Sequence, residues 1–447
     1  MLNKAYIWAV IVAGIVLLPF SRNIVCAEGI QRLSLEESVR LALKNSLVLN
    51  AVQESTKEAE ARKKEAFSAF LPQFSTNYSY TRLNEPPSFN FPGLPPLIPP
   101  STMITGTKDN YNWALELKQP LFAGGAIKTG YEIGLIGEEI ARSNVQTVQA
   151  DVIREVKTAY FRVLKAERIL DVAKQSVEGL QAHRDQAQSF FDHGLIPRND
   201  LLAAEVELAN GHQFLLRAQN GVGLAKAGMN TILRREIDAP LELDDILEYR
   251  PFEQTWDDCL KKALDNRPEI KGCNFQLEKA KKDIKQAQSE FLPTVSFLGN
   301  YSRYGDEPDV SGSTYQNQES WYLTVVANWN VWEGGRSKSR LNASLSREKQ
   351  VKDSCQNVQE RIILELKEAY LHVREAEQQI PTAKKAVIQA EENRRITNER
   401  YREQVARASD VIDAQTILTR AQSDYFNALG DYHISLADLG RAMGVEI

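Results

Sequence analysis

The chain has 447 residues, of which 25% are charged, and its formal net charge is −5. This charged fraction is ordinary for a folded protein, so disorder is not expected. The sequence shows no basic patch, which argues against a protein that binds nucleic acid.

The first 27 residues predict a secretory signal peptide. Lys4 precedes an apolar run from Ala5 to Leu18, and Cys26 and Ala27 end the segment as small residues at a cleavage site. A membrane anchor is the alternative, but the run is shorter than the roughly 20 residues that a spanning helix needs. The residues before Cys26 match a lipid-attachment signal poorly.

Two short helices are expected next. Ser34 and Glu37 have the spacing of a capping box, which predicts a helix that ends near Asn45. A second helix, about 48–70, ends before Pro72.

Two strands follow, at about 73–83 and 109–121. In both segments apolar and polar side chains alternate, as they do in a strand with one apolar face. The segment between them, 84–108, contains seven prolines, which predicts an irregular exposed loop.

A heptad pattern over about 126–191 predicts a very long helix, roughly 100 Å at 1.5 Å per residue. The same pattern returns 210 residues later, over about 336–402, which indicates an internal duplication. Each long helix is followed by a turn and by a helix of half its length, 199–235 or 409–441. Either Asn199 or Asp200 is expected to cap the first of these.

Pro381 interrupts the second heptad pattern, at the position where the first has Asp171. Proline lacks a backbone donor and clashes with the preceding turn. We therefore predict that the second long helix kinks or breaks near Ile380, whereas the first stays straight.

The chain thus divides into two tandem repeats, 28–235 and 254–447, joined by a link at 236–253. The strands of the second repeat are predicted at about 294–304 and 319–332. Before each long helix the strand must turn sharply, and glycine permits the positive φ that such a turn needs. The glycines at these turns are Gly124, Gly125, Gly334 and Gly335.

The four strands have nearly the length of about 9–11 residues that crosses a bilayer when tilted. Four strands cannot close a barrel with a lumen, and an open edge is forbidden in lipid, so several protomers would have to share one barrel. The long helices carry too many charges to lie in lipid. A membrane barrel continued by a helical cylinder would be a duct.

The duplicated order, the motifs at 119–125 and 331–335, and the turns at 191–200 and 401–415 resemble the TolC-like outer-membrane efflux proteins. The resemblance covers nearly all of the chain after residue 27. It implies a membrane β-barrel plus a long α-helical barrel, in which four strands per chain contribute to a twelve-stranded barrel shared by a homotrimer. It places the protein in the cell outer membrane, with the helical barrel in the periplasm and the link in an equatorial belt.

The resemblance also implies a function and partners. The protein would be the channel-tunnel of a tripartite efflux system, a passive exit duct in outer-membrane lipid. Its partners would be a periplasmic adaptor (membrane fusion protein) and an inner-membrane transporter of RND, ABC or MFS type. One alternative is the exit duct of a type I protein secretion system, and another is a periplasmic coiled-coil scaffold.

In this family the turns between the helices form the periplasmic entrance. By position, the residues implied for its constriction are Asp200, Tyr401, Arg407, Asp410 and Asp413. Those implied for the tips that dock the adaptor are Gly194, Leu195, Pro197, Gln404 and Val405. The sequence departs from the family's pattern where Ala406 replaces a basic residue and Gln404 replaces a glycine. Helix capping is the alternative role for Asp200 and Asp410.

No residues point to an enzyme. Once the predicted signal peptide with Cys26 is removed, three cysteines remain, Cys259, Cys273 and Cys355, and this odd number at wide spacing predicts free, packed cysteines. The five histidines (183, 193, 212, 372 and 433) lack metal-ligand spacing and are expected on solvated helix faces. Neither a nucleophile elbow nor a zinc motif is present, so we expect no catalysis, no cofactor and no metal.

Overall fold

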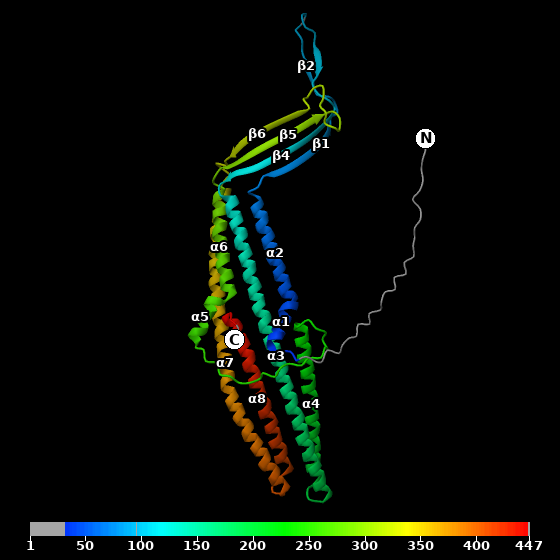
Figure 1. The fold of residues 1–447 in the computed structure, drawn as a ribbon, viewed down its shortest axis with the longest axis vertical. Coiled ribbons are helices and arrows are strands. Elements are labelled where there is room, and N and C mark those ends of the chain that lie inside the picture. Colours follow the sequence, from blue (N-terminus) through cyan, green and yellow to red (C-terminus); the bar gives the residue numbers. More distant parts are fainter. Residues whose placement is uncertain (1–31, 95, 446–447) are drawn as a thin grey trace, which may run out of the picture.

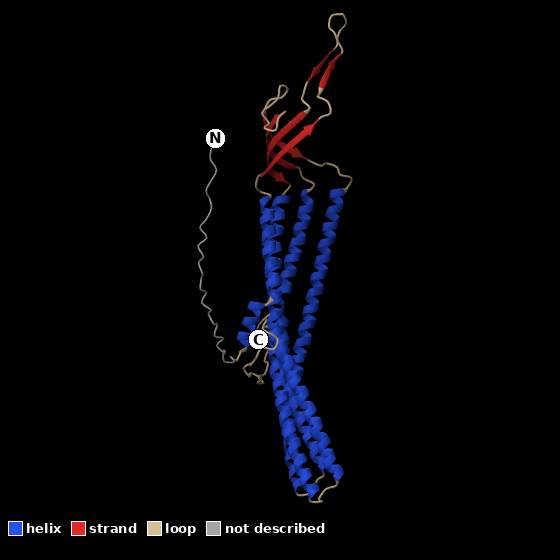
Figure 2. Ribbon diagram, turned by 90° about the vertical axis from the view of Figure 1, so that its right-hand side faces the viewer, coloured by secondary structure: helices blue, strands red, loops and turns tan. Residues whose placement is uncertain are grey.

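The computed structural model describes residues 32–94 and 96–445 (Figure 1). The predicted signal peptide, 1–27, lies outside the described residues. An antiparallel sheet occupies one end of the molecule, and long helices run from it to two tips at the other end (Figure 2). None of the helices in the described ranges is both long enough and apolar enough to cross a membrane.

The main sheet has four strands in the order β1-β4-β5-β6. Their bounds are Gln73–Arg82 (β1), Asp109–Ala123 (β4), Thr294–Gly305 (β5) and Glu319–Asn328 (β6). The central pair, β4 and β5, joins the two repeats, with Leu115 opposite Tyr301. The last strand ends four residues before the predicted position 332.

The prediction of an irregular loop over the proline-rich segment 84–108 is wrong. The segment contains a second antiparallel hairpin. Its strands are β2 (Ser88–Phe91) and β3 (Ser101–Ile104), and Phe89 lies opposite Met103. The prolines flank these strands and so remove no ladder hydrogen bond. Gly93, with φ of 74°, lies in the connection between them, where a Cβ would come within 2.5 Å of the carbonyl oxygen of Ile98.

Four shorter helices lie between the sheet and the middle of the molecule. Their bounds are Leu35–Asn45 (α1), Leu47–Ser68 (α2), Trp256–Asn266 (α5) and Pro268–Ser289 (α6). The predicted capping box is present: the Ser34 hydroxyl accepts the N–H of Glu37, and the Glu37 carboxylate accepts the N–H of Ser34.

The long helices are α3 (Ala126–Asp192) and α7 (Arg336–Arg402), and the half-length helices are α4 (Arg198–Ile232) and α8 (Ala408–Met443). Helix α2 packs on the upper part of α3, and α4 packs on its lower part. Between α3 and α7 lie α6 above and α8 below. Two of the four helical columns are therefore continuous, and two are interrupted at mid-height.

Of the predicted kink or break near Ile380, the break is wrong, because α7 continues through Pro381, and the kink stays a prediction. Ile380, which is 3% exposed, is buried in the central core. The Thr382 hydroxyl donates to the carbonyl oxygen of Gln378 at 3.1 Å, within the same turn. Burial along this helix offsets the cost of about 3 kcal/mol for an interior proline.

The link, 236–253, is part of the largest hydrophobic core rather than a loose connection. It buries Leu241, Leu243, Leu247 and Phe252 against the middle of the helices. The fully buried Tyr160 of α3 donates its hydroxyl to the carbonyl of Asp244 at 2.8 Å. The link thus holds α3 in place at the height where the shorter helices end.

The prediction of free cysteines is wrong for two of the three. Cys273 of α6 and Cys355 of α7 form a disulfide with a Cα–Cα distance of 5.6 Å, whereas Cys259 is free and buried. The pair is 82 residues apart in sequence. Antiparallel packing of α6 on α7 brings the two residues together, and cysteine spacing alone does not reveal such packing.

Candidate functional site at the helical tips

The two tips have the same backbone geometry. At the first, the N–H of Gly194 donates to Phe191 and that of Leu195 to Phe190, both at 2.8 Å. At the second, Gln404 donates to Tyr401 at 3.0 Å and Val405 to Arg400 at 2.8 Å. This is the Schellman ending of a helix, which needs a left-handed residue. Gly194 takes φ of 73° and Gln404 takes φ of 62°, so the second tip adopts the turn without glycine.

Each tip exposes an apolar residue directly after its turn. Leu195 is 52% exposed and Val405 is 64% exposed. The next helix starts at once, and the N-cap of α4 is Pro197 rather than the predicted Asn199 or Asp200. Proline has the extended backbone of a cap but offers no side-chain acceptor.

The three aspartates are placed differently. Asp410 is exposed and completes a capping box at the start of α8, since its Oδ2 accepts the N–H of the N-cap residue Arg407 at 3.0 Å. Asp413 is exposed one turn later and makes no hydrogen bond or ion pair within the described ranges. Asp200 is half-buried in the first turn of α4, where its charge raises the pKa of Tyr401 in addition to the larger effect of burial. Arg407 is exposed at the start of α8.

Tyr401 does not project from the tip but is 2% exposed, in a cluster with Ala408 and Val411. Its ring contacts Phe190, with centroids 5.4 Å apart, and His183, with centroids 5.1 Å apart. Aromatic packing therefore joins the α3–α4 hairpin to the α7–α8 hairpin near the tips. Of the implied constriction residues, the aspartates and Arg407 remain accessible.

The prediction that all histidines lie on solvated faces is wrong for His183, which is 6% exposed. Burial lowers its pKa, and the nearby backbone of Ala408 opposes this effect only in part. Neither ring nitrogen has a partner in hydrogen-bonding geometry among the described residues. His433 also departs from the prediction: it stacks on Phe161 with centroids 4.4 Å apart, and burial lowers its pKa too.

We predict that the contact between the hairpins weakens in acid. Because the pKa of His183 is lower in the folded state than in the unfolded chain, its contribution to stability is complete above about pH 6.5 and is lost as the pH falls towards the folded pKa. The wild-type melting temperature should fall between pH 7 and pH 5 by more than that of His183→Phe. Equal slopes would contradict this prediction. His433→Phe tests the half-buried His433 separately.

The glycine pairs between strand and helix occupy equivalent turns. Gly125 and Gly335 are the N-caps of α3 and α7, each with φ of 86°. Gly124 and Gly334 precede them with φ of 59° and 61°. All four have positive φ, as the sharp turn requires.

These turns provide a matched pair of substitutions. A Cβ at position 124 would lie 2.6 Å from the carbonyl oxygen of Ser289, whereas one at position 334 would meet nothing within 4 Å. We expect Gly334→Ala to cost about 1–2 kcal/mol for the left-handed backbone alone. Gly124→Ala should cost clearly more, since the backbone must also shift. Equal losses of stability in denaturant unfolding would show that the clash is relieved without cost.

In the part of the chain that the structure describes, no group of three or more His, Cys, Asp and Glu side chains is arranged to hold a metal. An ionic network at mid-height was not predicted from the sequence. Arg267 and Arg441, which are 3% and 8% exposed at their side chains, bind carboxylates from three different helices. A buried arginine has no sequence signature of its own, because its partners are distant in the chain.

The geometry agrees with comparisons to known proteins. A family model described as outer membrane efflux protein matches residues 39–233 and 259–445. Outer membrane protein TolC of Escherichia coli (strain K12) is 21% identical over 309 residues, which are 67% of this chain and 62% of that protein. Alkaline protease secretion protein AprF of Pseudomonas aeruginosa is 26% identical over 245 residues, 51% of this chain and 48% of AprF. The chain therefore spans less than two thirds of either relative.

The fold is similar to that of the Campylobacter jejuni CmeC outer membrane channel. The two superpose with a TM-score of 0.78 at 18% identity, covering 92% of this chain and 85% of that one. At this identity the likeness concerns the fold, a small antiparallel sheet continued by a long helical tunnel.

Proposed function

Because this chain belongs to the outer membrane efflux protein family, we propose that it forms the outer-membrane channel of a tripartite export system and acts as a passive exit duct. The observation that carries this proposal is the continuity of a membrane-sized sheet with helices 67 residues long, roughly 100 Å, which would extend into the periplasm. The proteins it resembles are outer-membrane channels and not enzymes, and this chain is not an enzyme either.

The channel would be a homotrimer with a twelve-stranded barrel. Among the residues that the structure describes, β1 and β6 have only one neighbouring strand each, and lipid does not tolerate an open edge. Exposed apolar side chains on these strands would face the lipid, among them Phe74 at 68%, Trp321 at 69% and Leu323 at 63%. Mass measurement in mild detergent tests this: a monomer with full strand content would refute the shared barrel.

A periplasmic adaptor would dock at the tips and connect the channel to an inner-membrane transporter of RND, ABC or MFS type. The exposed Leu195 and Val405 support this, since they place apolar surface beside Gly194, Pro197 and Gln404. Crosslinking from these positions, followed by identification of the co-purified complex, would name the transporter. A crosslinker placed in the β2–β3 hairpin serves as the control, and capture of the complex from the hairpin but not from the tips would contradict the proposed orientation.

A second candidate is the exit duct of a type I protein secretion system. The observation that favours it is the match to AprF, whose name describes protease secretion. Deleting the gene separates the two: an efflux duct changes tolerance to small toxic compounds, and a secretion duct changes the set of secreted proteins. A periplasmic scaffold, in contrast, would be extracted from membranes by salt without detergent.

Asp410 and Asp413 are three residues apart on α8 and are both exposed, so threefold symmetry would multiply them into rings. Carboxylates within a Debye length of about 8 Å attract cations. We predict that a trivalent cation blocks the channel from the periplasmic side and that Asp410→Asn with Asp413→Asn weakens this block at least tenfold. Single-channel current in a planar bilayer measures it.

The matched control replaces Asp306 and Asp309, which lie in the β5–β6 connection at the opposite end, with asparagine. This double variant loses the same amount of negative charge as the tip variant, but the trivalent cation should still block it from the periplasmic side. If both double variants are blocked as tightly as the parent, the tip aspartates serve only as part of the helix start.

A further inference from the structure

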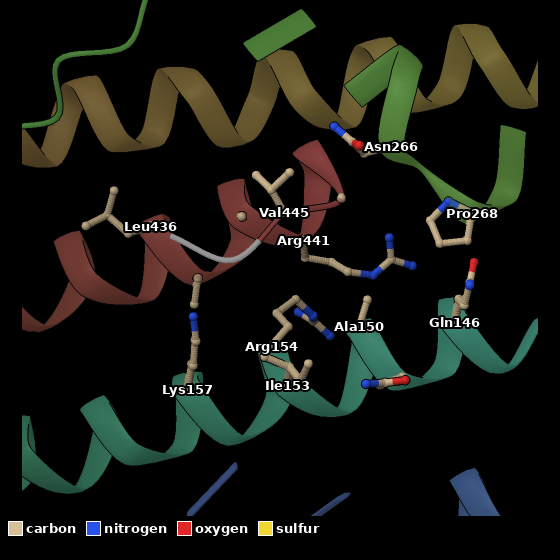
Figure 3. A pocket seen from close by; sticks show the side chains of 14 residues that line it. Gln146, Ala150, Ile153, Arg154, Lys157, Asn266, Pro268, Leu436, Arg441 and Val445 are labelled. Carbon is tan, nitrogen blue, oxygen red and sulfur yellow. The ribbon is translucent and has the colours of Figure 1, made fainter. Parts of the chain in front are cut away.

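A pocket of about 280 Å³ lies at mid-height, where α8 ends and α6 begins against the side of α3 (Figure 3). Helix α3 contributes Ile153, Arg154 and Lys157 to it, and α8 and the residues after it contribute Leu436, Arg441 and Val445. Pro268 marks the start of α6. Because the pocket lies within one protomer, its ability to bind a ligand does not depend on the proposed export function.

The lining combines positive charge with apolar surface. Arg154, Lys157 and Arg441 line the pocket, and none of the described residues that line it is acidic. The carboxylates that pair with Arg441, those of Asp151 and Glu269, are not among the lining residues, and Asp438 pairs with Arg154 at 3.3 Å on the exposed side. Ile153, Leu436 and Val445 supply an apolar surface beside the cations.

Two carboxylates hold the guanidinium group of Arg441, a hydrogen-bond donor, at one end of the pocket. Its Nε donates to Asp151 and its Nη2 to Glu269, both at 2.6 Å, and its side chain is 8% exposed. Its Nη1 is buried and has no hydrogen-bond partner within the described residues. The guanidinium lies between Ala150 and Pro268 in Figure 3. A buried donor without an acceptor is unfavourable, and an anion in the pocket would supply the acceptor.

An anion would reach Nη1 only if side chains at the rim turned aside, since this nitrogen is closed to solvent. Gln146 and Gln149 line the pocket, and both are exposed. Neither makes a hydrogen bond to the other described residues, so little opposes their rotation. Their amides can donate to the same anion once they have turned.

From this arrangement we infer that the pocket binds a small organic carboxylate with a short apolar body. The carboxylate lies towards Lys157 and Arg441, and the apolar body lies on Ile153, Leu436 and Val445. The bound molecule connects the end of α8 and the start of α6 to α3, which are separate helices at this height. Occupancy therefore stabilises the contact among these three helices.

Hexanoate tests the ligand class, with hexanamide as its neutral counterpart and inorganic phosphate as a charge without an apolar body. Binding to the full chain in maltoside detergent is followed by saturation-transfer NMR, with empty micelles as the blank. We expect hexanoate to bind in the millimolar range or more tightly, and the other two at least tenfold more weakly. Equal binding of hexanamide overturns the role of charge, and equal binding of phosphate overturns the role of the apolar wall. Absence of hexanoate binding overturns the site.

Two variants locate the binding. Ile153→Trp fills the pocket and should abolish hexanoate binding, provided that its melting temperature shows a folded protein. Lys157→Gln should weaken binding at least fivefold. The control is Lys174→Gln, which removes a lysine from α3 outside the pocket and should bind as the wild type does. If Lys157→Gln and Lys174→Gln behave alike, the site is not the one inferred.

Discussion

Replacement of Cys273 and Cys355 by serine lowers the free energy of unfolding by about 4–5 kcal/mol. The disulfide closes a loop with a sequence separation of 82 residues, which contains β5 and β6. Loss of this constraint raises the entropy of the unfolded chain by an amount that grows with loop length. For a loop of this size the increase corresponds to about 4–5 kcal/mol of lost stability. Denaturant unfolding followed by circular dichroism measures the difference.

A reducing agent provides the control for this experiment. It should destabilise the wild type by a similar amount and leave the double serine variant unchanged. The equivalent positions of the first repeat are Val52 and Val145, so reduction acts on the second repeat alone. If the reducing agent does not change the free energy of unfolding of the wild type, the disulfide contributes little to stability.

Arg267→Met should cost about 3 kcal/mol. Arg267 is 3% exposed, and it binds Glu269 at 3.0 Å, Glu365 at 2.9 Å and the carbonyl of Arg441 at 3.0 Å. Removing one member of a buried ionic group leaves the others uncompensated, which typically costs about 3–5 kcal/mol. We expect the lower end of this range, because Glu269 keeps its bond to Arg441 and the Glu365 side chain is 47% exposed.

The matched control is Arg395→Met. Arg395 also has two carboxylate partners, Glu392 at 2.6 Å and Glu399 at 2.7 Å, but its side chain is 56% exposed. Exposed pairs contribute less than about 1 kcal/mol. Thermal unfolding of both variants shows whether burial of the arginine, rather than its number of ion pairs, determines the loss of stability. Similar losses would mean that the mid-height network is solvated like the surface pair.

Helices and strands that are determined by a local pattern of apolar and polar residues could be predicted from the sequence. The heptads give α3 and α7 to within one residue, because the preceding glycine pairs and the following turns limit the helices on both sides. Alternation of apolar and polar side chains predicts the strands next to the long helices. The tip turns follow from the offset of 210, and Gln404 adopts the same left-handed conformation as Gly194.

The features that depend on which helix faces meet could not be predicted. The burial of Tyr401 and His183 follows from the contact between the α3–α4 and α7–α8 hairpins near the tips, which neither hairpin encodes alone. The same holds for the Cys273–Cys355 bond and for the partners of Arg267. Pro381 shows the reverse case, in which a strong local signal is overridden by packing along a helix of 67 residues.

The order of the main sheet has a consequence for biogenesis. The repeats meet at β4 and β5, which leaves β1 and β6 as free edges at opposite sides of a single chain. If three chains share the barrel, insertion into the bilayer cannot precede association, since a lone chain would bring two unpaired edges into lipid. The rate of maturation would then rise steeply with the concentration of newly secreted chains. A chain with prolines introduced along β6 would be dominant-negative, because one such copy would leave a seam that its two normal partners cannot close.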